Sequence, residues 1–417
     1  MRLPSFTSFA ATVGLALLAP SCGDDEANDD GTPGSQIPPD GPAYVVSISI
    51  GTPDGSSSVF AVVPSLDASI TADLSNNASV GGFGVTLATD AQGTVFVGLG
   101  ETPEIVRYTL TDAGVLEPGL RMSLQGRGFA SSAAGKVVLV APNKAYFVSV
   151  LEGRVIVWNP ETMTITGEFS LDLPAIEGLN AITAPDTIVF SDGRLTVPTL
   201  YWDEDGIVFG DRVITSVIDT NTDTVVSTDE DTRCGSAWFM HETSDGTQYV
   251  GGHVPHEVYR LALGEAGGTE ICHLRIVPPG GDFDDSFFVD LSSLTGGRPT
   301  GDFVLIDDNT AGILAFHEDE ATPFDDDVFD FAFQNAYRWY LWNLDESDAT
   351  LIQTDDAGSP AGRRFLIDGT WYFQEEDRTG IDADGNPVAT LLNITRDGQL
   401  QRGISVPGQI RNVLRIR

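Results

Sequence analysis

The chain has 417 residues and a formal net charge of −39 at pH 7, because 61 acidic side chains outnumber 22 lysines and arginines. A surface with that charge repels phosphate backbones and anionic lipid headgroups, which argues against a nucleic-acid partner. Short β-branched and aromatic runs alternate with Gly, Asp, Asn and Pro throughout, so the sequence predicts an all-β protein.

Residues 1–21 have the pattern of a bacterial signal peptide. Arg2 supplies a positive start, and residues 9–19 form an apolar run too short to span a bilayer, which needs about 20 apolar residues. Small residues then lead to Cys22, and this junction resembles the lipobox of bacterial lipoproteins. The resemblance implies that Cys22 carries a lipid. Ala19 stands where that family prefers leucine, and plain secretion with a nearby cleavage is the alternative.

Residues 22–42 form an acidic segment rich in Gly and Pro. From Gly23 to Pro42 there are six acidic residues and no basic ones, which leaves nothing to build a core. We therefore expect a flexible tether that holds the folded domain, residues 43–417, about 25 Å from the membrane. With a lipid on Cys22, the expected location is the outer membrane of the cell envelope, on its periplasmic or its surface side.

The other two cysteines, Cys234 and Cys272, lie 38 residues apart. Export implies an oxidising compartment, and acylation of Cys22 would leave these two as a pair with no odd thiol. We expect a disulfide between them. Two separate buried thiols are the alternative.

Strand-like segments recur along the folded domain at intervals of 51, 51, 49, 54, 54 and 68 residues. They begin at Tyr44, Val95, Tyr146, Leu195, Tyr249, Phe303 and Trp371. A period of about 50 residues matches a four-stranded propeller blade, and the seven segments predict seven blades. The long last interval predicts an insertion around residues 321–343.

Two turn motifs accompany these segments. Asp-Gly turns precede several strands, and the segments VWNPETMTI at 157–165 and VIDTNTDTV at 217–225 can be superimposed at an offset of 60 residues. On these motifs the chain resembles seven-bladed β-propellers with YVTN-like repeats. The C-terminal GQIRNVLRIR, residues 408–417, is too short for a blade. We expect it to pair with the N-terminal YVVSISI and close the ring.

Histidines gather in one part of the chain and raise the question of a metal or catalytic site. Four of the five are His241, His253, His256 and His273. The 253–256 pair flanks Pro255 in an expected loop, where that spacing sends the two side chains apart, so we expect no metal site. Acidic segments at 325–327 and 382–386 are fragments of calcium loops, and bound calcium remains possible. No other cofactor is expected, and no nucleophile elbow, HExxH, P-loop or dinucleotide motif is present.

Arginines recur where the inner strands of a propeller should begin. They are Arg127, Arg233, Arg363, Arg364 and Arg411, and Trp238 and His241 lie close to the second of them in sequence. If they converge on the channel, they would suit a compact anionic, aromatic ligand. A guanidinium group can donate two parallel hydrogen bonds to an anion and can stack on an aromatic ring. The alternative is that each arginine pairs with an aspartate between neighbouring blades.

A second aromatic and cationic segment is NAYRWYLWN at residues 335–343, which contains Arg338 and Trp339. Dense aromatic side chains near a loop mark recognition surfaces, and they also occur in the packing strand of a blade. The sequence leaves both interpretations open.

A tethered propeller without a catalytic motif predicts a binding protein. The plan is similar to surface propeller lipoproteins associated with siderophore uptake, and that resemblance implies capture of an anionic iron–siderophore complex for a partner transporter. A scaffold for a protein or polysaccharide partner is one alternative. A lactonase or lyase using His241, His253 and His256 is the other. We expect a monomer that contacts the membrane only through its N-terminal lipid.

Replacing Cys22 with serine is expected to release the protein from membranes, because the sequence contains no other apolar segment that could retain it. Fractionation of cells that express Cys22→Ser, beside cells that express the wild type, measures this directly. Retention of the variant in the membrane fraction after a high-salt wash would contradict anchoring through Cys22.

Overall fold

A computed structural model describes Ile37 and residues 41–417, except for 53–54, 69–71, 73, 75–76, 91, 130, 134, 152, 185–187, 204, 265–269, 278–280, 354–356, 361–362 and 382–386. The predicted signal peptide, Cys22, most of the predicted tether and the acidic segment 382–386 therefore lie outside the described residues. Within the described part, no helix combines the length and apolar character needed to cross a membrane.

The described strands form seven antiparallel sheets, which are the seven blades of a β-propeller. From inner to outer strand, blade 1 contains β29 (Gln409–Arg415), β1 (Tyr44–Thr52), β2 (Gly55–Val63) and β3 (Ala78–Gly81). Blade 2 contains β4 (Gly84–Thr89), β5 (Thr94–Leu99), β6 (Glu104–Leu110) and β7 (Leu116–Ser123). Blade 3 contains β8 (Gly135–Ala141), β9 (Lys144–Ser149), β10 (Arg154–Asn159) and β11 (Thr164–Ser170).

The remaining four blades follow the same order, with two short strands at the inner edge of blade 4. Blade 4 contains β12 (Asn180–Ile182), β13 (Val189–Ser191), β14 (Arg194–Trp202), β15 (Phe209–Asp219) and β16 (Thr224–Asp231). Blade 5 contains β17 (Phe239–Glu242), β18 (Gln248–Gly251), β19 (His273–Val277) and β20 (Asp282–Phe283). Blade 6 contains β21 (Thr300–Asp307), β22 (Thr310–Phe316), β23 (Tyr337–Asn343) and β24 (Thr350–Leu351). Blade 7 contains β25 (Arg364–Ile367), β26 (Thr370–Ile381), β27 (Pro387–Ile394) and β28 (Leu400–Pro407).

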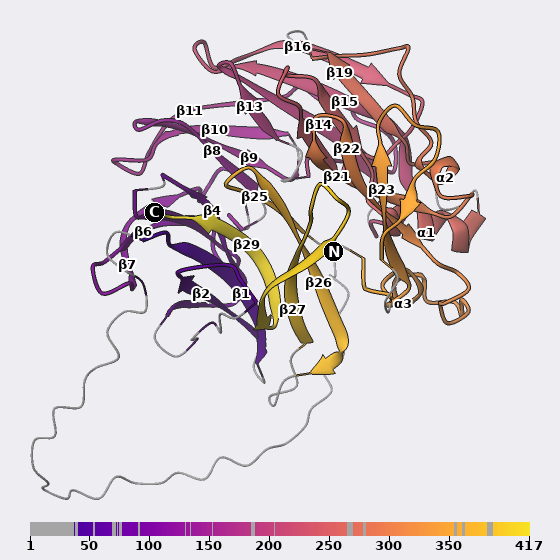
Figure 1. The fold of residues 1–417 in the computed structure, drawn as a ribbon. Helices are drawn as coiled ribbons and strands as arrows, with labels where there is room; N and C mark the ends of the chain where they lie inside the picture. The colour runs from indigo at the N-terminus through magenta and orange to yellow at the C-terminus, as the bar shows by residue number, and fades with distance from the viewer. Residues whose placement is uncertain are drawn as a thin grey trace, which may run out of the picture.

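The two ends of the chain close the ring, as predicted. The C-terminal strand β29 pairs antiparallel with β1, from Tyr44 opposite Arg415 to Ser49 opposite Gln409. Figure 1 shows this pairing as the yellow β29 lying beside the indigo β1. Inner strands of neighbouring blades also contact one another, including β29 with β4 and β4 with β8. Closure joins the first and last parts of the chain in one sheet, which removes an exposed strand edge.

Two of the Asp-Gly turns have the geometry that their sequences predict. Asp192 and Gly193 both have positive φ, as do Asp368 and Gly369, which is the conformation of the tight hairpin turn that Asp-Gly favours. The two superimposed segments also form the same local contact. The Thr162 and Thr164 hydroxyls lie 2.7 Å apart, and those of Thr222 and Thr224 lie 2.8 Å apart. The repeat is therefore structural.

One assignment in the repeat was wrong by a strand. Phe303 lies in β21, the inner strand of blade 6, whereas the other segment starts lie in or beside the second strand of each blade. The equivalent second strand is β22, which begins at Thr310. Because β21 is buried on both faces along most of its length, its FVLI run has the same apolar pattern as a second strand. Part of the long interval of 68 residues is explained by this assignment of Phe303 to a second strand.

The helices are α1 (Val254–Leu263), α2 (Leu291–Leu294) and α3 (Val328–Ala332). The structure places α3 in the expected insertion, whereas β23 is a regular blade strand. Helix α1 was not predicted: His253 is its N-cap residue, and Pro255 lies in its first turn, where proline needs no amide proton. The loop expected around Pro255 is therefore this helix. Figure 1 shows all three helices at the same side of the molecule.

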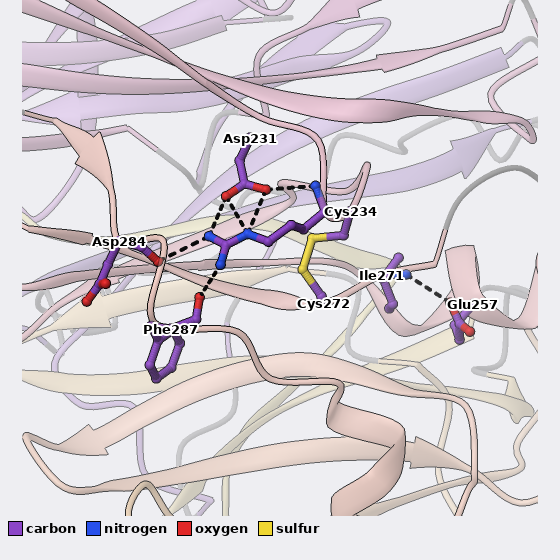
Figure 2. Close-up of a disulfide and its surroundings, with 8 residues drawn as sticks. Asp231, Cys234, Glu257, Ile271, Cys272, Asp284 and Phe287 are labelled. Carbon is purple, nitrogen blue, oxygen red and sulfur yellow. Dashed lines mark hydrogen bonds and ion pairs between the residues drawn. A yellow bond between two sulfur atoms is a disulfide. The ribbon is translucent and has the colours of Figure 1, made fainter.

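The predicted disulfide is present in blade 5. Cys234 lies before β17 and Cys272 before β19, with 5.7 Å between their Cα atoms. Figure 2 shows the bridge beside Glu257, whose carboxylate accepts a hydrogen bond from the Ile271 amide at 3.1 Å. The bridge joins the segment before β17 to the segment that leads into β19, and the Glu257 bond joins α1 to that same segment.

Replacing both cysteines with alanine is expected to lower the free energy of unfolding by about 3–4 kcal/mol, because a loop of this length then gains freedom in the unfolded chain. Urea unfolding of the double variant and of the wild type, each with and without reductant, measures the difference. The reductant should shift only the wild type. Equal unfolding free energies for wild type and variant without reductant would contradict a stabilising bridge.

Candidate functional site

Two cavities adjoin along the central channel of the propeller. We call the end where the inner strands begin the upper end. The upper chamber has a volume of about 320 Å³, and the lower chamber has a volume of about 550 Å³. Lys136, Phe365 and Asn412 line both chambers, so they form the narrow part between them.

The upper chamber is cationic. Lys136, Arg363 and Arg411 line it together with Phe83 and Trp238, and none of its described lining residues is an aspartate or glutamate. In the described part of the chain, none of the three cations forms an ion pair with a carboxylate within 4 Å. A protein of net charge −39 therefore has a local concentration of positive charge in this chamber.

Arg411 is the most strongly perturbed of these cations. Burial, together with the positive charge of Arg363, lowers the pKa of its guanidinium to about 10, while Glu376 acts in the opposite direction. Arg363 Nη1 donates to the Arg411 carbonyl at 3.3 Å, and the Arg411 guanidinium lies 4.3 Å from the centre of the Phe83 ring. Its Nε has no hydrogen-bond partner among the described residues.

The expected ring of five arginines does not form. Arg127 pairs with Glu168 on the outer strand β11, because the turn that holds it lies before β8 rather than at the start of that inner strand. Arg233 forms an ion pair with Asp231, in which Nε lies 2.9 Å from one carboxylate oxygen. Its Nη1 also donates to the Phe287 carbonyl at 2.9 Å, and Figure 2 shows these partners around it. Both residues therefore pair with carboxylates instead of converging on the channel, Arg127 with a glutamate and Arg233 with an aspartate two residues away.

Arg364 and His241 line the lower chamber. The Arg364 side chain is buried and pairs with Asp302, which is completely buried, at 2.9 Å. His253 Nδ1 donates to the same carboxylate oxygen at 2.7 Å. His241 Nε2 donates to the Phe303 carbonyl at 2.7 Å, and Arg364 Nη1 donates to that carbonyl as well. This network joins the inner strands of blades 5, 6 and 7 with the start of α1.

Four buried histidines, His317 among them, have lowered pKa values. Burial is the main cause for His241, His256 and His273. The neighbouring Arg364 charge also lowers the pKa of His241, and it helps to lower that of His273 to about 3. Both imidazoles are therefore neutral at physiological pH.

A cluster of residue types that can bind metals lies elsewhere, at His317, Asp319 and Glu320, whose ligand-type atoms lie within 4.8 Å of one another. Arg298 holds the Asp319 carboxylate at 2.7 Å, and Arg338 holds that of Glu320 at 2.7 Å. A cation would have to displace both arginines. In the acidic segment 325–327, the Asp327 carboxylate caps α3 by accepting a bond from the Asp330 amide.

The second aromatic segment forms the strand β23. Trp339 is buried and packs on Phe373, with 4.2 Å between ring centres, and Arg338 pairs with Glu320. Neither residue lines the channel chambers. Sequence reasoning missed Lys136 and Asp302. Lys136 is one of only two lysines in the chain, which was the signal available for it; nothing in the sequence marks Asp302 as buried.

No protein-family model matches this chain, and no curated protein sequence matches it. Solved structures share its fold. The periplasmic gluconolactonase of Pseudomonas aeruginosa is 12% identical, with 90% of this chain and 99% of that one aligned at a TM-score of 0.51. A candidate 6-phosphogluconolactonase of Bacteroides fragilis is 12% identical, with 90% of this chain and 98% of that one aligned at a TM-score of 0.51. A hypothetical selenium-binding protein of Sulfolobus tokodaii is 10% identical, with 92% of this chain and 94% of that one aligned at a TM-score of 0.52. These similarities establish the propeller fold.

The four buried histidines with lowered pKa values predict that stability falls as the pH drops below about 6.5. The imidazoles of the unfolded chain are then protonated, whereas those of the folded protein stay neutral. The unfolded state therefore binds more protons, and the free energy of unfolding decreases. Each histidine contributes up to about 1.4 kcal/mol per pH unit, and the loss continues down to the folded pKa, about 3 for His273.

His273→Phe should reduce this dependence, because neither ring nitrogen of His273 has a hydrogen-bond partner among the described residues. Urea unfolding at several pH values between about 7.5 and 5 measures the slope, a range in which carboxylates contribute little because their ordinary pKa lies near 4. An unchanged slope in the variant would show that His273 is protonated in the folded state.

Proposed function

We propose that this protein binds a compact anionic ligand in the upper chamber of the channel. The observation that carries the proposal is the grouping of Lys136, Arg363 and Arg411 around one cavity without a described carboxylate in its lining. Several cations close together, with Arg411 partly desolvated, cost stability unless a counter-charge is bound, so the arrangement suits an anion that completes it.

The size and lining of the chamber indicate a small ligand with an unsaturated or aromatic part. A volume of about 320 Å³ is at the lower end of small-molecule sites. Phe83 and Trp238 supply ring faces, while guanidinium groups supply forked hydrogen bonds for a carboxylate, a phosphate or a catecholate.

The more specific proposal is that the ligand is an anionic iron–siderophore complex, captured by a lipid-anchored protein at the outer membrane for a partner transporter. Its support is the lipobox-like sequence at Cys22 together with the charge of the chamber. A larger complex would extend past Lys136, which borders both chambers, into the lower chamber. The lining of the lower chamber includes Glu242, Asp307 and Asp308, so the anionic groups of the complex would stay in the upper chamber.

The alternative enzyme function is favoured by one observation, the fold shared with the gluconolactonase of Pseudomonas aeruginosa. His241 lines the lower chamber, but its Nε2 is bonded to the Phe303 carbonyl and its Nδ1 is enclosed. His253 is bonded to Asp302, and His256 Nδ1 lies 3.0 Å from the Ser236 hydroxyl. Because the three imidazoles have structural partners or no access, binding is the better supported function.

Titration calorimetry with ferric catecholate siderophores, ferric carboxylate siderophores and sugar lactones tests the proposal. Lys136→Ala and Arg363→Ala should each weaken the bound anion by about 1–3 kcal/mol, or about 5- to 150-fold, because each removes one charge from the chamber. Arg127→Ala is the matched control, since it removes the same charge from an outer surface pair.

Equal losses in the control and the chamber variants would refute the chamber as the site. Binding of none of the ferric complexes, with binding of another anion that the two variants weaken, would refute only the siderophore. Consumption of a lactone by the wild type, followed by acid release, would establish the enzyme alternative.

A further inference from the structure

An apolar groove lies between α1 and α3, away from the channel. The cavity has a volume of about 350 Å³ and is lined mainly by Leu261, Ala262, Ala321, Pro323, Phe324 and Phe331. Leu261 and Phe324 expose 40% and 37% of their surface, and the neighbouring Phe329 exposes 45%. We call this cavity and Phe329 the helix groove. Three large apolar side chains exposed together on a very acidic protein indicate a surface that is covered in use.

The two helices that form the groove are insertions at equivalent places in adjacent blades. Helix α1 lies between the second and third strands of blade 5, and α3 lies between the second and third strands of blade 6. The end of β18 pairs with the start of β17, and the end of β22 pairs with the start of β21. Both insertions therefore rise from the upper face, where the inner strands begin.

The groove is a formed feature held by specific bonds. Glu257 of α1 binds both Arg260 and the Ile271 amide, next to the disulfide. On the other side, the Gln334 side chain accepts from the Thr322 amide at 2.6 Å and donates to the Thr322 carbonyl at 3.1 Å. A preformed groove loses little conformational entropy when a partner binds.

The rim of the groove is acidic. Glu318 lines the cavity, and Asp325, Asp326 and Asp330 lie in the adjoining segment and on α3. All four are exposed, and none of their carboxylates forms an ion pair with a described residue. An apolar floor with an unneutralised acidic rim complements a segment that combines apolar and basic side chains.

We propose that the helix groove docks a polypeptide segment of a partner protein, in which one or two large apolar side chains are flanked by lysine or arginine. The apolar side chains enter between α1 and α3, and the basic side chains pair with the rim. An anionic membrane surface is disfavoured by the rim charge. A second copy of this chain would bring its own charge of −39 to the contact, which disfavours self-association.

Helix α1 connects the groove with the upper chamber, because Leu261 and Ala262 near its end line the groove while its start lies at the chamber. Trp238, which lines that chamber, contacts the imidazoles of His253 and His256 at the start of α1, with 6.0 and 5.1 Å between ring centres. A protein docked on α1 therefore stands beside the mouth of the channel. The docking proposal itself does not depend on what the chamber binds.

A display library of random 12-residue peptides, selected on the purified protein, tests the proposal. We expect enrichment of peptides that combine an aromatic or leucine side chain with flanking lysine or arginine. Binding of an enriched peptide should fall at least about tenfold in Leu261→Ser and Phe324→Ser, since each removes part of the apolar floor. Leu120→Ser is the matched control, because Leu120 is also an exposed leucine and lies on the outer strand of blade 2, outside the groove lining.

The rim is tested separately with Asp325→Asn combined with Asp326→Asn, against the exposed Asp112→Asn as control. We expect the rim variant to weaken the peptide and to reduce the dependence of its Kd on salt, and the control to do neither. Peptides without the basic and apolar bias, or binding that Phe324→Ser leaves unchanged, would overturn the proposal. So would a dimer in sedimentation that Phe324→Ser dissociates, because the occupant would then be a second copy.

Discussion

The buried ion pair between Arg364 and Asp302 fixes how the last blades meet. Each side chain comes from the start of an inner strand, and the pair lies where water has no access. Losing one partner of such a pair costs about 3–5 kcal/mol, because the remaining charge has no substitute for solvent. Adjacent residues of an extended chain point to opposite sides, so holding Arg364 toward blade 6 sends Arg363 toward the upper chamber.

The backbone around Asp302 is shaped for this contact. Asp302 has a φ of +54°, and its amide donates to the Gly252 carbonyl at 3.0 Å. A Cβ at Gly301 would lie 2.7 Å from the Val254 nitrogen, so the strand can approach the start of α1 only with glycine there. The contact of Gly301 and Asp302 with the start of α1 therefore positions the inner strand of blade 6 and the ion pair with Arg364. It also positions α1, the helix that forms half of the groove.

The sequence predicted what depends on local pattern. Asp-Gly turns, the period of about 50 residues and the closing strand all follow from short-range preferences, and they gave the correct fold. The arginine ring depended on the distance of each residue from its strand start, and Arg127 lies too far before β8 to reach the channel. Lys136 and Asp302 acquire their roles through contacts between blades, which a local pattern does not record. Helix α1 interrupts a strand pattern at Pro255, where a loop was the simpler expectation.

The upper face combines two opposite electrostatic environments. An anionic ligand that approaches a protein of charge −39 is repelled at long range, but salt at physiological strength screens charges beyond about 8 Å. Near the mouth, the field is then set by the closest charges, which in the described lining are Lys136, Arg363 and Arg411. Moderate salt should thus weaken the repulsion from distant carboxylates more than the attraction inside the chamber. A basic segment bound in the helix groove would act in the same direction, because it neutralises acidic residues on the face that the ligand must cross.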